Sequence, residues 1–308
     1  MTQPLRVLVT GANGQVGVDL IDVLQGITPL GGDQTFQPDG RVIEGSEFDV
    51  VGLHRADLDV SDRDAVMRTV AVVRPDVIVH LAAYTAVDRA EVETQTCFAV
   101  NASGTESMSL AANECGAHLI TISTDYIFDG LKGASYVEED AAHPLNVYGA
   151  SKFAGELLCD ERDTIVRTSW VMGVRGKNVV HVIADRAAAG GTVKFVDDQM
   201  GTVTVASDLA RSLATMIRER PGGTWHVANA GTITWFDVAA YVGALSGREE
   251  GFATPIATDD LDPVPLATRP SRSDLSTVKF SSQWETLPSW REGVARIVRD
   301  RVVRNGSQ

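Results

Sequence analysis

The sequence predicts an α/β protein with a doubly wound parallel sheet and a smaller, discontinuous C-terminal region. Two observations predict this class. Short runs rich in Val and Ile alternate with stretches of helical period as far as about residue 170, and such continuously apolar runs are typical of strands covered by helices on both faces. A glycine-rich turn also follows the first apolar run directly, as it does in Rossmann-type sheets.

The expected elements follow one another along the chain. Five apolar runs are expected as strands of the sheet: 6–10, 49–54, 76–80, 118–123 and 164–168. The stretches between them are long enough for helices: 15–25, 61–73, 91–115 and 147–161. Beyond these we expect helices over 179–189, 207–219 and 236–245, a strand over 224–228, and a proline-rich ordered loop over 261–270.

This pattern divides the chain into two regions without a clean linker. Residues 1–170 form the dinucleotide-binding Rossmann region, and 171–308 form a region that closes over the sheet and packs partly back on it. Residues 26–45 are rich in Gly, Pro and Asp, and we expect a surface loop insertion there without a clear role.

Composition excludes several classes of partner. The chain of 308 residues has a formal net charge of −14, which argues against nucleic acids and anionic membranes as general partners. No apolar run approaches the length of a membrane span. The chain has three cysteines, Cys97, Cys115 and Cys159, without CxxC spacing. Such a small, odd number is typical of a protein whose thiols stay reduced. We therefore expect a cytoplasmic protein without a signal peptide.

The glycine-rich turn predicts a dinucleotide site. Glycines at 11, 14 and 17 allow a tight turn and a close approach of the backbone to a pyrophosphate, which the following helix N-terminus would attract. His54 and Arg55 end the second strand, and an arginine there favours the 2′-phosphate of NADPH. Because Asp57 and Asp59 follow closely, NADH stays an alternative.

A tyrosine and a lysine indicate reductase chemistry. Tyr148 and Lys152 lie four residues apart, on one face of an expected helix. We expect the ammonium to favour the phenolate and so to lower the pKa of the tyrosine. The phenol could then protonate a carbonyl oxygen while hydride reaches the carbon. Ser123 and Thr124 end the fourth strand, where a hydroxyl could orient that carbonyl.

Longer segments extend these motifs over almost the whole chain. They are TGANGQVG at 10–17, RPDVIVHLAAYTAVDRAE at 74–91, NASGT at 101–105, STDYIFDG at 123–130, PLNVYGASKFAGE at 144–156, RTSWVMG at 167–173, DDQMGTVT at 197–204 and RPSRSDL at 269–275. Together they resemble the extended short-chain dehydrogenase/reductase superfamily and, within it, the dTDP-4-dehydrorhamnose reductase family. The resemblance implies NADPH-dependent reduction of the C4 keto group of dTDP-4-dehydro-β-L-rhamnose, a step in the synthesis of nucleotide sugars for cell-envelope polysaccharides.

The resemblance also implies a role for individual residues. The catalytic group would be Thr124, Tyr148 and Lys152, with Tyr148 as the proton donor. The residues expected at the cofactor, besides Tyr148 and Lys152, are Gly11, Asn13, Gly14, Gln15, Val16, His54, Arg55, Asp57, Leu58, Ala82, Ala83 and Tyr84. The dTDP-sugar would be bound mainly by residues 171–308. The individual residues expected to contact it are Thr85, Val87, Asp125, Tyr126, Trp170, Arg269 and Arg272. Asn101 would be a structural residue near the active site.

Assembly and two further functions stay open at this point. Some members of the family are thought to dimerise around a metal held by carboxylates, but Asp19 stands here in place of the expected Glu. We therefore expect no metal site, while Mg²⁺ and a homodimer are not excluded. The alternatives are another nucleotide-sugar epimerase or dehydratase of the superfamily, or a non-catalytic regulatory subunit that binds cofactor. A dehydratase is disfavoured because Asp125 is followed by Tyr126 and not by Glu.

Overall fold

A six-stranded parallel sheet forms the centre of the computed structural model, which describes residues 3–32, 36–248 and 251–306. Its strands lie in the order β10 (Gly223–His226), β5 (Thr164–Thr168), β4 (His118–Thr124), β3 (Val77–His80), β1 (Leu5–Thr10) and β2 (Phe48–Leu53). The strand order reverses between β1 and β3, which defines the point where doubly wound sheets bind ligands. The predicted fold class and its first five strands are confirmed.

Helices cover both faces of the sheet. Successive side chains of a strand point to opposite faces, so the apolar strands present side chains for helices to bury on each face. Val7 and Val9 of β1 pack with α1 (Gln15–Leu24) and α8 (Ala206–Glu219), whereas Leu8 packs with α2 (Arg63–Val73) and α5 (Gly104–Cys115). The helix α6 (Val147–Glu156) also lies against α5 and β4. The short helix α10 (Val278–Gln283) contributes the fully buried Phe280 to the α1–α8 face.

Two predicted helices are shorter than expected. The stretch 91–115 is divided into α4 (Thr94–Phe98), a π-helical turn (Ala99–Ser103) and α5, with α3 (Val87–Ala90) before them. In the stretch 147–161 the helix ends at Glu156, and a turn follows it. In that turn the Asp160 N–H donates to the carboxylate of Asp163 over 2.9 Å, and the chain then enters β5.

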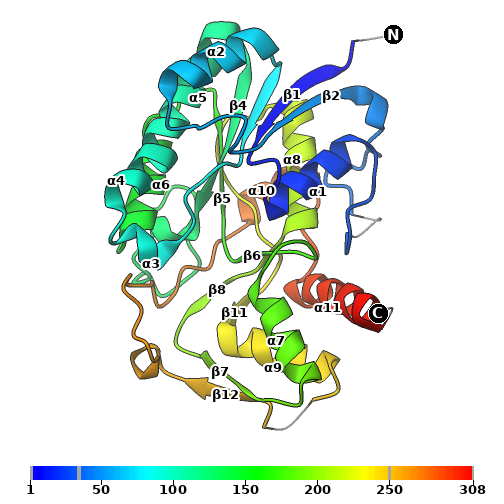
Figure 1. Cartoon of the computed structure of the whole chain (residues 1–308), viewed down its shortest axis with the longest axis vertical. Coiled ribbons are helices and arrows are strands. Elements are labelled where there is room, and N and C mark those ends of the chain that lie inside the picture. Colours follow the sequence, from blue (N-terminus) through cyan, green and yellow to red (C-terminus); the bar gives the residue numbers. More distant parts are fainter. Residues whose placement is uncertain (1–2, 33–35, 249–250, 307–308) are drawn as a thin grey trace.

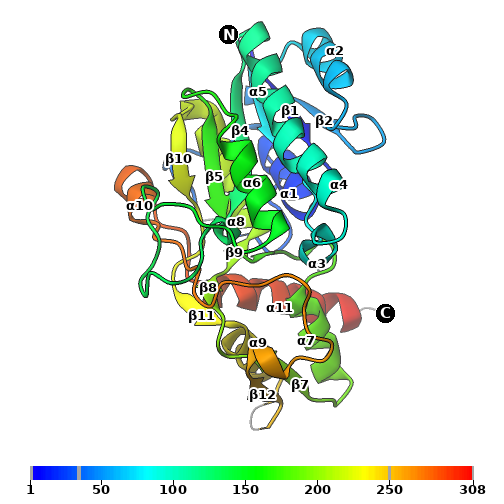
Figure 2. The ribbon, with the colours of Figure 1, turned by 90° about the vertical axis from the view of Figure 1, so that its left-hand side faces the viewer.

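The C-terminal half builds a second layer of helices and short strand pairs, which gathers at one end of the molecule in Figures 1 and 2. Its helices are α7 (Val179–Ala188), α9 (Trp235–Leu245) and α11 (Trp290–Gly306). Its strand pairs are β6 (Val171–Met172) with β9 (Thr204–Val205), β8 (Met200–Thr202) with β11 (Thr232–Thr234), and β7 (Val193–Val196) with β12 (Ala253–Ile256). A separate apolar core holds this layer together, while α8 and β10 of the same half return to the central sheet.

The insertion at 26–45, described apart from residues 33–35, is more than a surface loop. Phe36 is almost fully buried in the main core. Arg218 of α8 pairs with Asp39 at 3.1 Å and with Glu47, just beyond the insertion, at 2.8 Å. The expectation of a surface loop is therefore wrong for these residues, because a buried aromatic ring and paired charges anchor the segment to α8. Residues 261–270 contain neither a helix nor a strand, as expected.

Candidate active site

A cleft of about 940 Å³ opens at the carboxyl ends of the central strands. It spans the β1–β3 reversal and continues past β4 to the segment after β5. The predicted site residues that line it are Gly11, Asn13, Gly14, Gln15, Val16, His54, Arg55, Leu58, Ala82, Ala83, Tyr84, Thr85, Val87, Thr124, Asp125, Tyr126, Tyr148, Lys152 and Trp170. Asp57, Arg269 and Arg272 are not among the lining residues.

The glycine-rich turn forms a cradle in which two positions, 11 and 17, have no room for a Cβ atom. Gly11 has a φ of 66°, and a Cβ there would lie 2.8 Å from the backbone nitrogen of Ala82. A Cβ on Gly17 would lie 2.4 Å from the carbonyl oxygen of Gly11. Gly14 is the N-cap of α1 and has no side chain to cap it, so the first N–H groups of the helix are open to an anion. This geometry fits the pyrophosphate of a dinucleotide.

Arg55 and Asp59 give another part of this cleft both signs of charge. Arg55 is exposed, and within the described ranges it makes no ion pair. The carboxylate of Asp57 accepts a hydrogen bond from the His54 N–H over 2.8 Å and so holds the turn after β2. The charge of Arg55 helps to lower the pKa of Asp59, and its exposed guanidinium suits a phosphate on the adenosine ribose.

The helix α6 brings Tyr148 and Lys152 into the middle of the cleft. Asn146 caps this helix by accepting a hydrogen bond from the Gly149 N–H over 2.8 Å. A Cβ on Gly149 would lie 2.1 Å from the carbonyl oxygen of Tyr126, so glycine lets α6 approach the segment after β4. The rings of Tyr126 and Tyr148 then meet edge to face, with centroids 6.1 Å apart.

Burial controls the charges of this pair. It raises the pKa of Tyr148 to about 12; the Thr124 hydroxyl opposes this rise, and the Asp125 charge adds to it. The expectation that Lys152 lowers the pKa of Tyr148 is therefore wrong for this structure, because burial disfavours the phenolate and Lys152 is not among the groups that shift this pKa. Burial also lowers the pKa of Lys152 to about 8. At neutral pH the pair is a neutral phenol beside a charged ammonium.

The Lys152 side chain is mostly buried and lines the cleft, and among the residues that the structure describes its ammonium makes no hydrogen bond or ion pair. Such a group costs free energy unless a ligand supplies oxygen atoms to it. Its position in the cleft, one turn of α6 from Tyr148, fits the hydroxyls of a cofactor ribose.

Thr124 and Asp125 form a buried hydroxyl–carboxyl group beside Tyr148. The Thr124 hydroxyl donates to Asp125 over 3.1 Å, and the Ser273 hydroxyl donates to the other oxygen of Asp125 over 2.5 Å. Burial raises the pKa of Asp125 to about 7, although both hydrogen bonds oppose this rise. The carboxyl group therefore serves contacts within the protein, and Ser273 is a residue that sequence reasoning missed.

Asn101 connects the third-strand side of the cleft with α6. Its amide oxygen accepts from the Tyr84 N–H over 2.8 Å, and its amide nitrogen donates to the Tyr84 carbonyl over 3.0 Å and to Ser151 over 2.9 Å. The amide thereby fixes the backbone after β3 and the residue that precedes Lys152.

The two predicted arginines are held by acids of the protein. Arg269 forms a two-fold contact with Asp88, of 2.6 and 2.9 Å, and it also opposes the burial that raises the pKa of Tyr126. Arg269 thus lies beside Tyr126, which lines the cleft. Arg272 pairs at 2.7 Å with the buried Asp274 and donates to the Gly133 carbonyl, so its placement at a diphosphate is not supported. A buried carboxylate needs such a cation.

The residues around Asp19 do not fit a bound Mg²⁺. Burial raises the pKa of Asp19 to about 7, and Arg175, 3.4 Å away, opposes this rise. The same guanidinium pairs with Asp22 at 2.6 Å. Across the ranges described above, no group of three or more His, Cys, Asp or Glu side chains could hold a metal ion.

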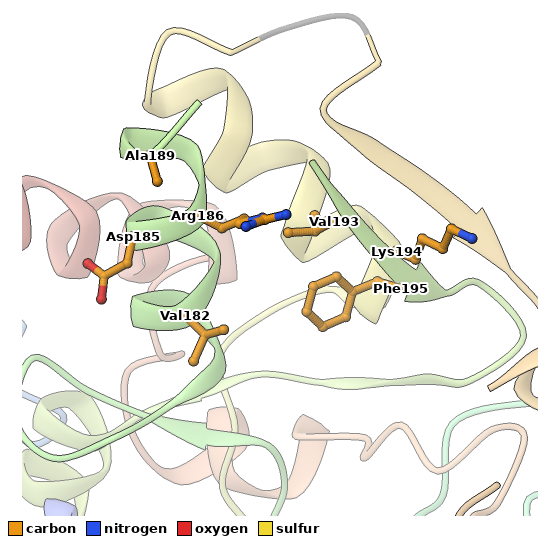
Figure 3. Close-up of a pocket in the computed structure, with 7 residues that line it drawn as sticks. All are labelled: Val182, Asp185, Arg186, Ala189, Val193, Lys194 and Phe195. Atoms are coloured by element: carbon orange, nitrogen blue, oxygen red, sulfur yellow. The ribbon is translucent and has the colours of Figure 1, made fainter. Parts of the chain in front are cut away.

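A second hollow, of about 540 Å³, lies on the C-terminal layer (Figure 3). The residues of α7, β7 and the turn between them that line it are Val182, Asp185, Arg186, Ala189, Val193, Lys194 and Phe195. None of the predicted site residues belongs to this hollow. In the described part of the chain, no helix is long and apolar enough to span a membrane.

The fold and the cleft define a Rossmann-type oxidoreductase. A sequence profile described as "RmlD substrate binding domain" matches residues 39–303. The chain is 37% identical to "dTDP-4-dehydrorhamnose reductase" of Escherichia coli (strain K12), over 96% of this chain and 98% of that one. It is 35% identical to "dTDP-4-keto-6-deoxy-D-glucose reductase" of Streptomyces niveus, over 82% and 83%.

A solved structure agrees with these matches. It is dTDP-4-dehydrorhamnose reductase from Bacillus anthracis str. Ames in complex with NADP, which has a TM-score of 0.84 and 31% identity and covers 96% of this chain and 99% of that one. The chain belongs to the dTDP-4-dehydrorhamnose reductase family, as its sequence motifs predict.

Proposed function

We propose that this protein reduces the C4 keto group of dTDP-4-dehydro-β-L-rhamnose with NADPH, giving dTDP-L-rhamnose. The observation that carries the proposal is the position of Tyr148 and Lys152, one turn apart on α6, in the same cleft as the glycine cradle. Membership of a family whose relatives carry this reductase name supports the choice of substrate. Cytoplasmic NADPH would supply such an enzyme.

The chain's own residues would hold NADPH along the cleft. Gly11, Asn13, Gly14, Gln15 and Val16 would surround the pyrophosphate, since the first N–H groups of α1 are open there. Arg55 would pair with the 2′-phosphate, and the NADP complex of the Bacillus anthracis relative supports NADPH over NADH. Leu58, Ala82, Ala83 and Tyr84 would flank the adenosine and ribose groups. When bound, NADPH supplies the hydride.

The proton comes from the protein. Tyr148 donates its phenolic proton to the C4 oxygen as the carbonyl carbon gains hydride, which leaves an alcohol and a phenolate. Thr124 would orient the carbonyl by turning its hydroxyl from Asp125 to the C4 oxygen. Lys152 would hold the nicotinamide ribose and stabilise the phenolate by its charge until water restores the proton.

The sugar would lie between the sheet and the C-terminal half. Thr85, Val87, Tyr126 and Trp170, from the segments after β3, β4 and β5, all line the cleft. Arg269 lies beside Tyr126 and is the remaining candidate for the diphosphate. We retain the division into a cofactor-binding part (1–170) and a mainly sugar-binding part (171–308), with α8 and β10 returning to the sheet.

The test is the stoichiometry of NADPH oxidation with the keto sugar made by upstream dehydratase and epimerase. We expect one NADP⁺ for each dTDP-L-rhamnose formed. An epimerase or dehydratase would convert sugar without net release of oxidised cofactor, and a regulatory subunit would convert none. Leaving out the epimerase supplies dTDP-4-keto-6-deoxy-D-glucose. Preferred turnover of that sugar would favour the activity named for the Streptomyces niveus relative.

A further inference from the structure

Trp170 has a backbone conformation that large side chains rarely adopt. Its φ is 41°, in the left-handed region, which costs free energy unless neighbouring contacts impose it. Those contacts are present on both sides. The Ser169 hydroxyl donates to the Thr202 carbonyl over 2.5 Å, and the Thr204 N–H donates to the Trp170 carbonyl over 3.4 Å. The backbone at Trp170 is therefore set by the segment around β8 and β9.

The indole of Trp170 is held as firmly as its backbone. It stacks on Trp235, the first residue of α9, with ring centroids 4.0 Å apart and planes 15° apart. A Cβ on Gly201 would lie 2.7 Å from atoms Cε2 and Cζ2 of the indole, so glycine leaves room for the ring. Thr234 and Asp237 form a capping box that fixes the start of α9 and hence Trp235.

Only one of these two tryptophans reaches the cleft. Trp170 is among its lining residues, whereas Trp235 is not and touches the cleft only through Trp170. A flat aromatic wall suits the apolar face of a deoxyhexose. Its angle matters, because the C4 carbonyl must meet both Tyr148 and the hydride, and a small misplacement lowers the rate of reaction.

We propose that Trp235 and Gly201 are positioning residues that hold the indole of Trp170 at the angle needed to bind the keto sugar. The inference rests on the proposed function, because it takes the keto sugar as the ligand of Trp170. Trp235 acts from outside the cleft, so its effect falls on sugar binding and not on the cofactor.

The test compares Trp235→Leu, Trp235→Phe and Gly201→Ala with the unmodified protein in steady-state kinetics. We expect Trp235→Leu and Gly201→Ala to raise KM for dTDP-4-dehydro-β-L-rhamnose about tenfold, with KM for NADPH within about twofold. Trp235→Phe retains a stacked ring and should restore most of the sugar affinity. Tyr241→Leu is the matched control, because it removes a ring of α9 that contacts Trp290 and not Trp170.

A spectroscopic readout accompanies the kinetics. Two stacked indoles couple in circular dichroism. We expect Trp235→Leu to remove the contribution of the Trp170–Trp235 pair and Tyr241→Leu to retain it, while the Trp225–Trp284 pair contributes equally in both variants. An active wild type whose KM for the sugar is unchanged in both Trp235→Leu and Gly201→Ala overturns the inference and leaves the proposed function intact. A wild type that does not oxidise NADPH with the keto sugar overturns the proposed function, and the inference with it.

Discussion

The Asn101 amide nitrogen donates a hydrogen bond to the Ser151 hydroxyl over 2.9 Å, and Ser151 donates in turn to the Tyr148 carbonyl over 2.7 Å. Asn101 lies in the π-helical turn, so one wide turn of a neighbouring helix holds the segment of α6 that carries Tyr148 and Lys152. Wide turns of this kind are frequent at functional sites.

Asn101→Ala should therefore reduce both stability and turnover. It removes four hydrogen bonds, to Tyr84, Cys97 and Ser151, and leaves the half-buried backbone N–H and carbonyl of Tyr84 without this side chain, so we expect a loss of about 1–3 kcal/mol in the free energy of unfolding. We also expect kcat to fall more than KM for NADPH rises. The control is Asn113→Ala, which removes an exposed amide on α5 that donates to Asp160 over 3.3 Å. Equal kcat values in the two variants would contradict this positioning role.

Tyr148→Phe should remove the proton donor and little else. We expect kcat to fall about 10²–10⁴-fold, the usual worth of a general acid, with the Kd of NADPH within about twofold. Tyr126→Phe is the matched comparison, because its ring lies against Tyr148 in the same cleft. A larger loss of kcat in Tyr126→Phe than in Tyr148→Phe would transfer the donor role to Tyr126.

Lys152→Met should make the protein inactive but more stable at neutral pH. Burial lowers the pKa of Lys152 from 10.5 to about 8, so below pH 8 the folded protein carries a charged ammonium at a cost of about 3 kcal/mol. Between pH 8 and pH 10.5 Lys152 is deprotonated in the folded state and still protonated in the unfolded state. The stability of the wild type therefore rises with pH towards that of the variant. Above pH 10.5 the difference in stability between wild type and variant should vanish.

Urea unfolding of wild type and Lys152→Met from pH 7 to pH 10 measures this difference directly. Lys177→Met, at an exposed position, controls for the added methionine. A stability difference that does not shrink as the pH rises would show that the ammonium is not strained by burial.

Arg55→Ala should weaken NADPH binding selectively. Loss of a charge-assisted contact with the 2′-phosphate predicts an increase of about 10–100-fold in KM for NADPH, while kcat/KM for NADH stays within about twofold. Initial rates with both cofactors measure the ratio. The exposed Arg68→Ala of α2 removes the same charge elsewhere. If both variants change the ratio alike, Arg55 makes no specific contact.

Local sequence patterns predict the parts of this site that depend on chain geometry. The glycine turn, the strand ends and the Tyr148–Lys152 spacing all follow from short-range rules, and the structure brings these residues into one cleft. The π-helical turn escaped prediction, because the helical period of 91–115 does not reveal one wider turn.

Properties set by tertiary contacts could not be predicted in the same way. The pKa of Tyr148 depends on how completely water is excluded around it, which no spacing records. The left-handed backbone of Trp170 depends on β8 and β9, about thirty residues further along the chain. Arg272 looks like a phosphate ligand in the sequence, but the buried Asp274 two residues later takes its charge.

The crystal structure of the protein with NADP⁺ and dTDP-L-rhamnose would test the proposed proton transfer most directly. We predict that the sugar C4 hydroxyl lies within hydrogen-bonding distance of the Tyr148 oxygen, with C4 facing the nicotinamide and the ammonium of Lys152 on its ribose. A sugar bound with C4 directed away from Tyr148, or a nicotinamide outside this cleft, would contradict the proposed reaction.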